Sequence, residues 1–253
     1  MPQQSIVSKL LKFQGSANHT TNIAGNPNPQ RLVLYDHFTG IAVDTTNDWN
    51  SNGQASGAVT ITAPHHATIT TESNDDDEWT LSSGLHFYGQ YNAVMEARVR
   101  TDDLDGLTWN VGFNDAIYES GKVPFTYNGT SLTSNCNDGV AFMWDVNATT
   151  DYLYAVSCKN TADGTVLNNA RAVVESTWCT VRIELRDNGS RTDALFYCNV
   201  TGNAINPQAD YVGMEVDAVT RTDPLCVYVA VMNEEAAANT FDIDYIKAWQ
   251  DEY

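Results

Sequence analysis

The chain has 253 residues, with 32 acidic and 13 basic side chains, a formal net charge of −19 and an isoelectric point near 4.3. This length fits one large domain, and an apolar fraction of 42% is far above that of a disordered chain. The acidic balance argues against nucleic acid as a partner, because phosphate binding needs clustered Lys and Arg. No apolar run approaches the length of a membrane span, so we expect no membrane contact either.

Residues 1–30 are predicted to form an N-terminal arm and linker, separate from a domain at 31–253. The arm carries a charge of +2, whereas the domain carries −21. Repeated proline in 26–29 favours an extended connector. The apolar and basic side chains that we expect to dock on a partner are Ile6, Val7, Lys9, Leu10, Leu11, Lys12 and Phe13. The alternatives are an arm that folds back onto the acidic domain, and a frayed terminus.

The first residues lack the pattern of a secretory signal, because lysines interrupt their apolar stretch and none precedes it. We therefore expect synthesis in a reducing cytoplasm. The five cysteines, an odd number without a CxxC pair, indicate neither a zinc site nor a thioredoxin motif. Four of them, Cys158, Cys179, Cys198 and Cys226, lie in or beside strand-like segments and are predicted to be free thiols that fill apolar space.

From Arg31 onward the apolar residues recur with a period of two, which is typical of half-buried strands. Asn92–Arg100 and Thr180–Arg186 show it most clearly, and Leu225–Met232 is apolar on both faces, as in a central, doubly covered strand. Further strands are predicted at Ala58–Thr62, Ala67–Thr71, Trp79–Phe87, Gly139–Trp144, Tyr152–Cys158 and Ala194–Val200. Turn dipeptides such as Asn128-Gly129 and Asn188-Gly189 separate them. The pattern predicts an all-β fold, a two-sheet antiparallel β-sandwich with an extended N-terminal arm.

Several motifs of the domain resemble the concanavalin A-like lectin/glucanase jelly roll. Leu32–Gly40, followed by Asp48-Trp49, resembles its opening strand, and Phe241–Gln250 resembles its closing strand. Tyr91–Arg100 and Val111–Ala116 are similar to two inner strands, in a form found in tailed-phage virion proteins encoded beside the major capsid protein. The resemblance covers roughly 31–253 and implies the fold more strongly than the function.

An enzyme of the family 16 glycoside hydrolase type, which has this fold, needs carboxylates at alternate positions of one strand. The nearest match, Glu215-Val216-Asp217, lacks the third acid, and Asp242-Ile243-Asp244 also has two. Glu184 lies between Arg182 and Arg186 on its own strand face, as in a surface ladder. We therefore expect no catalytic residues and no enzymatic activity.

Two binding chemistries remain open in the sequence. Loop acids at Asp75, Asp77, Asp103 and Asp105 offer hard oxygen ligands for calcium, although solvated loops carry such runs more often, and we expect no metal and no cofactor. Trp49, Trp79 and Trp109 are the candidates for stacking on sugar rings, although sandwiches also place Trp in their cores.

These observations favour a bacteriophage virion structural protein, a decoration or cement protein that binds the major capsid protein on the outer capsid surface and stabilises the head. We expect a homo-oligomer, with a trimer at local three-fold positions as one form. The alternative function is a carbohydrate-binding, lectin-like adhesion module on the virion that binds a surface glycan. A family 16 glycoside hydrolase is the third reading.

Overall fold

The computed structural model describes residues 30–252 except positions 41, 47, 55–56, 63–64 and 169–170. Its regular elements are almost all strands. They are β1 (Gln30–Asp36), β2 (Asn50–Gly53), β3 (Ala58–Thr62), β4 (His66–Thr70), β5 (Glu78–Ser82), β6 (Val94–Thr101), β7 (Leu107–Asn114), β8 (Phe125–Tyr127), β9 (Leu132–Ser134), β10 (Gly139–Trp144), β11 (Tyr154–Lys159), β12 (Ala162–Asp163), β13 (Leu167–Asn168), β14 (Cys179–Asp187), β15 (Thr192–Asn199), β16 (Tyr211–Val219), β17 (Cys226–Asn233) and β18 (Thr240–Glu252). One 3-10 helix, η2, covers Gly89–Tyr91.

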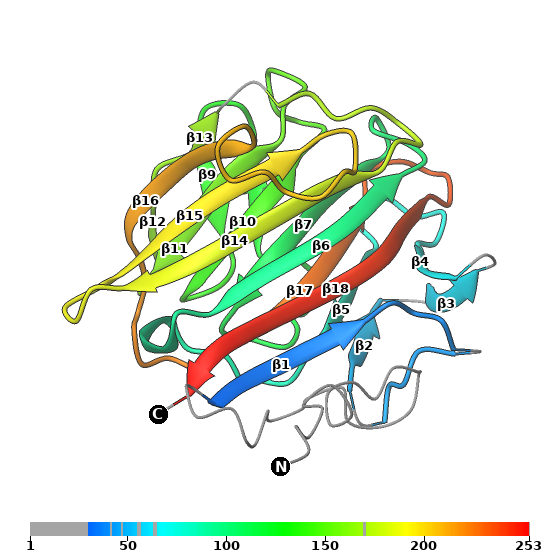
Figure 1. Cartoon of the computed structure of the whole chain (residues 1–253). Helices are drawn as coiled ribbons and strands as arrows, with labels where there is room; N and C mark the ends of the chain where they lie inside the picture. The colour runs from blue at the N-terminus through cyan, green and yellow to red at the C-terminus, as the bar shows by residue number, and fades with distance from the viewer. Residues whose placement is uncertain are drawn as a thin grey trace, which may run out of the picture.

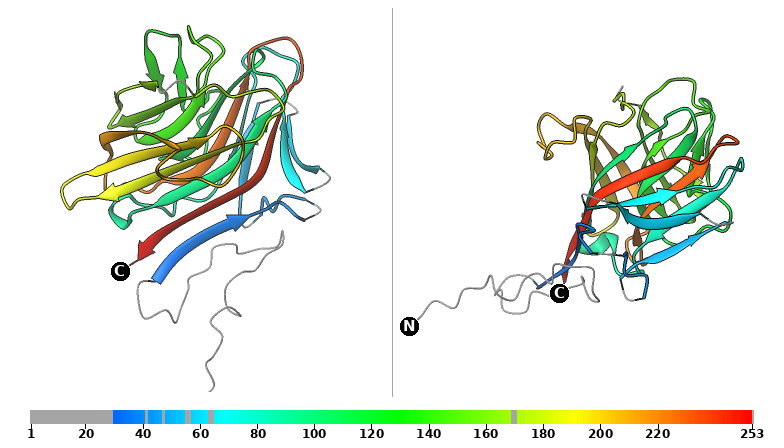
Figure 2. Two further views of the ribbon diagram at one scale, coloured as in Figure 1. Left: turned by 45° about the horizontal axis from the view of Figure 1, so that its top comes forward. Right: turned by 90° about the vertical axis from the view of Figure 1, so that its right-hand side faces the viewer.

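The strands form two stacked antiparallel sheets. Sheet A has the order β16-β15-β14-β6-β18-β4-β3, with β1 also paired to β18. Sheet B has the order β12-β11-β10-β7-β17-β5-β2, with β13 on β11, and β8 and β9 form a separate hairpin. Figure 1 looks onto sheet A with sheet B behind it, and Figure 2 shows the two layers from other directions.

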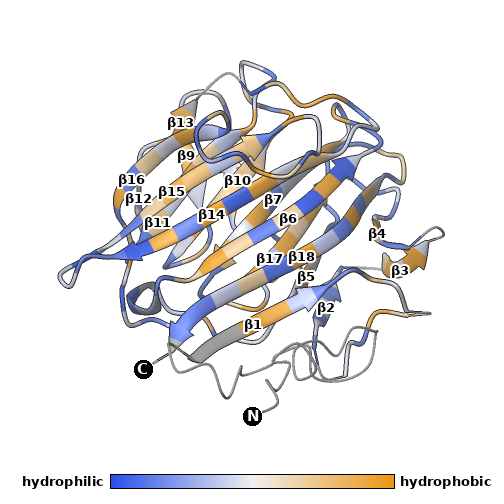
Figure 3. Ribbon diagram, in the orientation of Figure 1, coloured by the Kyte–Doolittle hydropathy of each residue, from blue (hydrophilic) through white to orange (hydrophobic). Residues whose placement is uncertain are grey.

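The main core lies between the inner faces of the two sheets. The period of two turns Val181, Ile183 and Leu185 of β14 inward, where they are fully buried. The Phe142 ring of sheet B meets the Phe196 ring of sheet A at 5.6 Å between centroids, in an edge-to-face contact. Figure 3 shows the resulting alternation of polar and apolar residues along the strands of sheet A.

A second apolar cluster covers the outer face of sheet B, the face turned away from sheet A. The segment 115–138, which includes the β8–β9 hairpin, contributes Val123 and Phe125 to this cluster, opposite Tyr228 and Ala230 of β17. Asn110 of β7 fixes the hairpin, since its side chain accepts a 2.8 Å hydrogen bond from the Phe125 amide and donates a 3.1 Å bond to the Phe125 carbonyl. Strand β17 is therefore buried on both faces, which confirms the prediction for Leu225–Met232.

The structure confirms the all-β sandwich and most of the predicted strands. The strand expected at Trp79–Phe87 ends at Ser82, after which Phe87 makes only an isolated bridge with Leu225. Asn128-Gly129 and Asn188-Gly189 connect β8 to β9 and β14 to β15, with positive φ at both glycines.

The five cysteines are free and buried, which confirms the prediction for Cys158, Cys179, Cys198 and Cys226. Within the described part of the chain, no helix is long and apolar enough to cross a membrane. The arm residues Ile6, Val7, Lys9, Leu10, Leu11, Lys12 and Phe13 lie outside the described residues.

Candidate functional site

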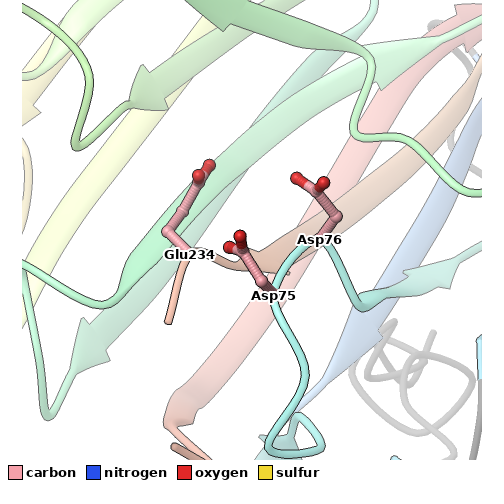
Figure 4. Close-up of side chains that lie close together, drawn as sticks. All are labelled: Asp75, Asp76 and Glu234. Carbon is pink, nitrogen blue, oxygen red and sulfur yellow. The ribbon is translucent and has the colours of Figure 1, made fainter. Parts of the chain in front are cut away.

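Three carboxylates meet at one end of the sandwich. Asp75 and Asp76 lie in the loop between β4 and β5, and Glu234 directly follows β17. Each offers an oxygen atom, and these atoms all lie within 4.8 Å of one another. Figure 4 shows the two aspartates on one loop and the glutamate on the neighbouring segment. We call these three residues the acidic cluster.

Asn233, the last residue of β17, positions the loop that carries the two aspartates. Its carbonyl accepts a 2.8 Å hydrogen bond from the Asp76 amide, and its own amide donates a 2.8 Å bond to the Asp77 carbonyl. Its fully buried side chain donates a 2.9 Å bond from Nδ2 to the Asn74 carbonyl. Asn239 Nδ2 donates a 2.9 Å bond to Asn233 Oδ1. The loop is thus held against the end of a central strand by a buried amide.

The loop conformation gives Asp77 a different environment from Asp75 and Asp76. Asp76 has φ +67°, a left-handed conformation that Asp tolerates better than most residues. Asn74 Nδ2 donates a 2.8 Å bond to Asp77 Oδ2, so the Asp77 carboxylate is engaged within its own loop. Asp75 and Asp76 stay exposed beside Glu234.

Glu234 is the partly buried member of the cluster. Burial raises the pKa of its carboxyl, and the neighbouring carboxylates of Asp145 and Asp76 raise it further. Asn147 Nδ2 donates a 3.3 Å bond to Glu234 Oε2. Oε1 is buried, and the Thr108 hydroxyl lies close enough to Glu234 to lower the pKa of this carboxyl by hydrogen bonding.

Asp145 and Asn147 form a second, more ordered layer beside the cluster. Asp145 is 5% exposed and follows β10. Its carboxylate accepts a 2.6 Å bond from the Tyr127 amide and a 2.9 Å bond from the Asn147 amide. This turn places the Asn147 side chain on Glu234. The cluster therefore presents three carboxylates, whose oxygen atoms are ligands that suit a hard cation.

The structure brings one of the four calcium candidates from the sequence into this cluster, Asp75. Asp77 is engaged with Asn74, as described above. Asp103 Oδ1 accepts hydrogen bonds of 2.7 Å and 3.0 Å from the amides of Asp105 and Gly106, which makes Asp103 a turn cap, and Asp105 is exposed. Among the residues that the structure describes, the Asp75, Asp76 and Glu234 group is the one with a metal-compatible spacing.

Two of the three tryptophans proposed to stack on sugars are buried, so this prediction is wrong for them. Trp49 and Trp109 are each 2% exposed. Trp49 Nε1 donates a 2.9 Å bond to Asp36, and the Trp109 ring lies against Phe241. Trp79 is half-buried, with its ring close to the backbone of Gly53, and its Nε1 donates a 3.0 Å bond to Ser51.

Trp178 and Trp249, two tryptophans outside these three candidates, lie under arginine side chains of sheet A. Trp178 is half-buried beneath two guanidinium groups, with Arg98 at 4.8 Å and Arg100 at 4.5 Å from the ring centroid. Trp249 of β18 lies beneath Arg182 at 5.3 Å. Their exposed edges are on the outer face of sheet A.

The acids that match a glycosidase strand each form an ion pair or a hydrogen bond with a neighbouring group. Asp217 of β16 forms a 2.6 Å ion pair with Lys159, and Glu215 accepts a 3.2 Å bond from the Thr165 amide. Asp242 pairs with Arg100 at 2.7 Å, and Asp244 pairs with Arg98 at 2.8 Å.

Glu184 contacts both Arg182 and Arg186, at 2.7 Å and 2.9 Å, as the sequence predicted. These acids form surface ladders.

Glu234 and its neighbour Asn147 are the site residues that the sequence analysis missed. They lie far along the chain from Asp75, and only the strand pairing brings the three segments together. The signal that could have found them is an acid or amide directly after a buried apolar strand, as in Asn233-Glu234 and Asp145-Val146-Asn147.

Comparison with known proteins identifies the fold. No family model and no curated protein matches the sequence. A legume lectin-like domain from Entamoeba histolytica has a TM-score of 0.55 and 8% identity, over 79% of this chain and 89% of that one. The exoplasmic/lumenal domain of VIP36 in its Ca²⁺/Man3GlcNAc-bound form has a TM-score of 0.53 and 8% identity, over 84% and 88%.

A κ-carrageenase from Pseudoalteromonas carrageenovora, in complex with an oligotetrasaccharide of κ-carrageenan, has a TM-score of 0.53 and 11% identity, over 90% of this chain and 98% of that one. At such low identity these likenesses show the fold alone. The chain therefore has the fold of a lectin-like jelly-roll sandwich.

Proposed function

We propose that this protein is a carbohydrate-binding, lectin-like module that holds a divalent cation, Ca²⁺, at the acidic cluster. The observation that carries the proposal is the convergence of Asp75, Asp76 and Glu234 within 4.8 Å at one end of a lectin-like sandwich. The fold supports it, since the similar VIP36 domain has Ca²⁺ and an oligomannose ligand in its structure.

The cluster fits a calcium ion by the chemistry of its donors. Asp75, Asp76 and Glu234 would supply carboxylate oxygens, and the hydrogen bond from Asn147 Nδ2 holds the Glu234 carboxylate in place. Glu234 is partly buried beside Asp75 and Asp76, and a cation would offset the repulsion among the three carboxylates. When bound, the ion would order the loop and coordinate hydroxyl oxygens of a sugar.

We also propose that the protein does not cleave its ligand. In support, Asp217, Asp242 and Asp244 are in ion pairs with basic side chains, and Glu215 accepts a backbone hydrogen bond. A retaining glycosidase needs a free nucleophile and a protonated acid about 5–5.5 Å apart. A reducing-sugar assay on any bound polysaccharide checks this, and release of sugar would contradict it.

The role on a phage head stays a prediction from the sequence. It depends on the arm at 1–30, which lies outside the described residues, and on the motif resemblance. A carbohydrate-binding module displayed on a virion would agree with both the proposed carbohydrate binding and the predicted virion role. Co-sedimentation of the full chain and of a chain lacking 1–30 with empty heads would test the arm as an anchor.

The carbohydrate proposal is tested on a glycan array with the full chain, in calcium and in EDTA. We expect a saturable hit that is lost in EDTA and in the Glu234→Gln variant. Asp105→Asn, which removes an exposed loop acid outside the cluster, is the matched control and should bind normally. Absence of any hit would overturn carbohydrate binding, and a hit unaffected by EDTA would overturn the role of the cation.

A further inference from the structure

The two sheets differ in what covers their outer faces. The outer face of sheet B lies under the segment 115–138. The outer face of sheet A is turned toward the viewer in Figure 1 and is open over most of β14, β6 and β18. The loop after β15 lies against one end of this face, since Arg98 Nε of β6 donates a 2.9 Å hydrogen bond to the Gly202 carbonyl of that loop.

Strand register places two rows of side chains across six strands on this open face. The first row is largely apolar and consists of Val33, Trp249, Val94, Glu184, Leu195 and Met214. The second row consists of Tyr35, Lys247, Glu96, Arg182, Tyr197 and Tyr211. Directly opposed residues share a face, so each row is continuous from β1 to β16. Tyr, Trp, Met and Arg are the residue types enriched in protein interfaces.

The apolar character of this face is most exposed at its β16 edge. Tyr211, Met214 and Val216 are 43–44% exposed, whereas Leu195 and Tyr197 lie under their neighbours. An edge strand with exposed apolar side chains is a surface that other chains recognise. The face therefore carries exposed apolar side chains on β16 and the half-buried Trp249 on β18, near the opposite side.

The charges on the three central strands of this face, β14, β6 and β18, are nearly balanced, unlike those of the rest of the chain. Across 94–101, 180–186 and 242–249 there are five basic and four acidic side chains. Subtracting these from totals of 13 and 32 leaves eight basic and 28 acidic side chains elsewhere. Because acidic side chains outnumber basic ones elsewhere, contact through the remaining surface would on average bring like charges together. Through this face they would meet without net repulsion.

The ion pairs on the face also lower the cost of docking. Lys247 contacts Glu96 at 2.7 Å, and Arg182 contacts Glu184 at 2.7 Å while covering Trp249. These side chains are already ordered and paired, so binding need not immobilise them or leave a charge alone. A row with both signs is also able to face its own antiparallel copy, as a two-fold interface requires.

We propose that the outer face of sheet A is the surface on which a second copy of this chain docks, forming a two-fold dimer. Six strands span about 24 Å, and the two rows with their neighbours extend about 20 Å along the strands. Such a contact would bury on the order of 1,000 Å² in total, near the lower limit for a specific interface. The dimer should therefore be weak, with a dissociation constant in the micromolar range, and it would pair two acidic clusters for bivalent binding.

Sedimentation velocity of the full chain over a concentration series tests this inference. We expect a reversible dimer that Met214→Glu and Tyr211→Glu each weaken at least tenfold. Added salt should not dissociate it, because the face is neutral and the remaining charge is repulsive. Val174→Glu removes a 60% exposed apolar residue outside the sheets and should leave the dimer unchanged.

Thermal melting of each variant confirms that the monomers remain folded. A chain that stays monomeric at every concentration would overturn the proposal, as would a dimer that both sheet A variants leave intact. The glycan array reads single copies as well, so failure of the dimer is distinguishable from failure of carbohydrate binding.

Discussion

The Asp76 amide donates a 2.8 Å hydrogen bond to the Asn233 carbonyl, which fixes an exposed acidic loop to the end of a fully buried central strand. Asn233 in turn is 0% exposed and uses both side-chain ends for hydrogen bonds. The geometry of the acidic cluster therefore depends on one residue that is not itself a carboxylate.

Replacing this residue should affect stability and the cluster together. Asn233→Ala leaves the Asn74 carbonyl and the Asn239 side chain without their buried partner, at a cost of about 2–4 kcal/mol of unfolding free energy. Denaturant unfolding measures this cost. Asn203→Ala, at an exposed loop amide, is the control and should change stability by less than about 0.5 kcal/mol.

The pH dependence of the unfolding free energy should reflect the titration of the buried Glu78 carboxyl. Burial, with a smaller contribution from Glu119, raises its pKa from 4.5 to about 7, even though Thr80, Tyr118 and Gly121 donate hydrogen bonds that lower it. The folded state thus binds more protons than the unfolded chain between pH 4.5 and 7. Stability contributed by this group is therefore present below pH 4.5 and is lost as pH rises toward 7.

The Glu78→Gln variant isolates this effect. It should be more stable than the parent above pH 7, by about 1–3 kcal/mol, and similar to it near pH 4.5, because only the parent buries a charge at high pH. Thermal unfolding across this pH range is the measurement, with the exposed Glu175→Gln as control. An equal difference between variant and parent at both pH values would contradict the assignment.

Packing between the two sheets should contribute most of the stability that the core provides. Phe142 is fully buried in the interior of sheet B and meets Phe196 of sheet A. Phe142→Ala leaves a cavity between the layers and should cost about 3–5 kcal/mol in urea unfolding. Leu85→Ala, at a side chain that is 37% exposed, should cost less than about 1 kcal/mol. Similar losses for both variants would mean that the sheets do not pack in this way.

The five thiols should be unreactive in the folded protein. All five are buried, which shields them from an alkylating reagent, and burial raises the pKa of the Cys226 thiol well above its usual range. A hydrogen bond from Cys136 lowers the pKa of the Cys158 thiol, so the protection of Cys158 depends on its burial. Mass spectrometry after alkylation should find no modified cysteine in the native chain and five in denaturant. Rapid native alkylation of any one of them would show that its strand opens.

The sequence predicted the sandwich because the period of two is a local signal. Gly139–Trp144 and Ala58–Thr62 form strands with the expected bounds, and the apolar strand at Leu225–Met232 is central. The β8–β9 hairpin was not predicted, because its strands have three residues each and carry little periodicity. The covering of sheet B by this hairpin also explains an inner strand with apolar residues on both faces.

The candidate site was predictable only in part. Asp75 stood out in a run of acids, but its partner Glu234 is brought to it by the pairing of β5 with β17, which no local pattern reports. The burial of Trp49 and Trp109 was likewise set by long-range packing, since composition alone does not separate a core tryptophan from a sugar platform.

Thermal melting of the metal-stripped protein with added calcium tests the acidic cluster most directly. Binding at a hundredfold excess over the dissociation constant adds about 2.7 kcal/mol, which for a domain of this size raises the melting temperature by roughly 5–10 °C. We expect this rise in the parent and in Asp105→Asn, and its loss in Glu234→Gln. An unchanged melting temperature in the parent, or the same rise in Glu234→Gln, would contradict a cation site at Asp75, Asp76 and Glu234.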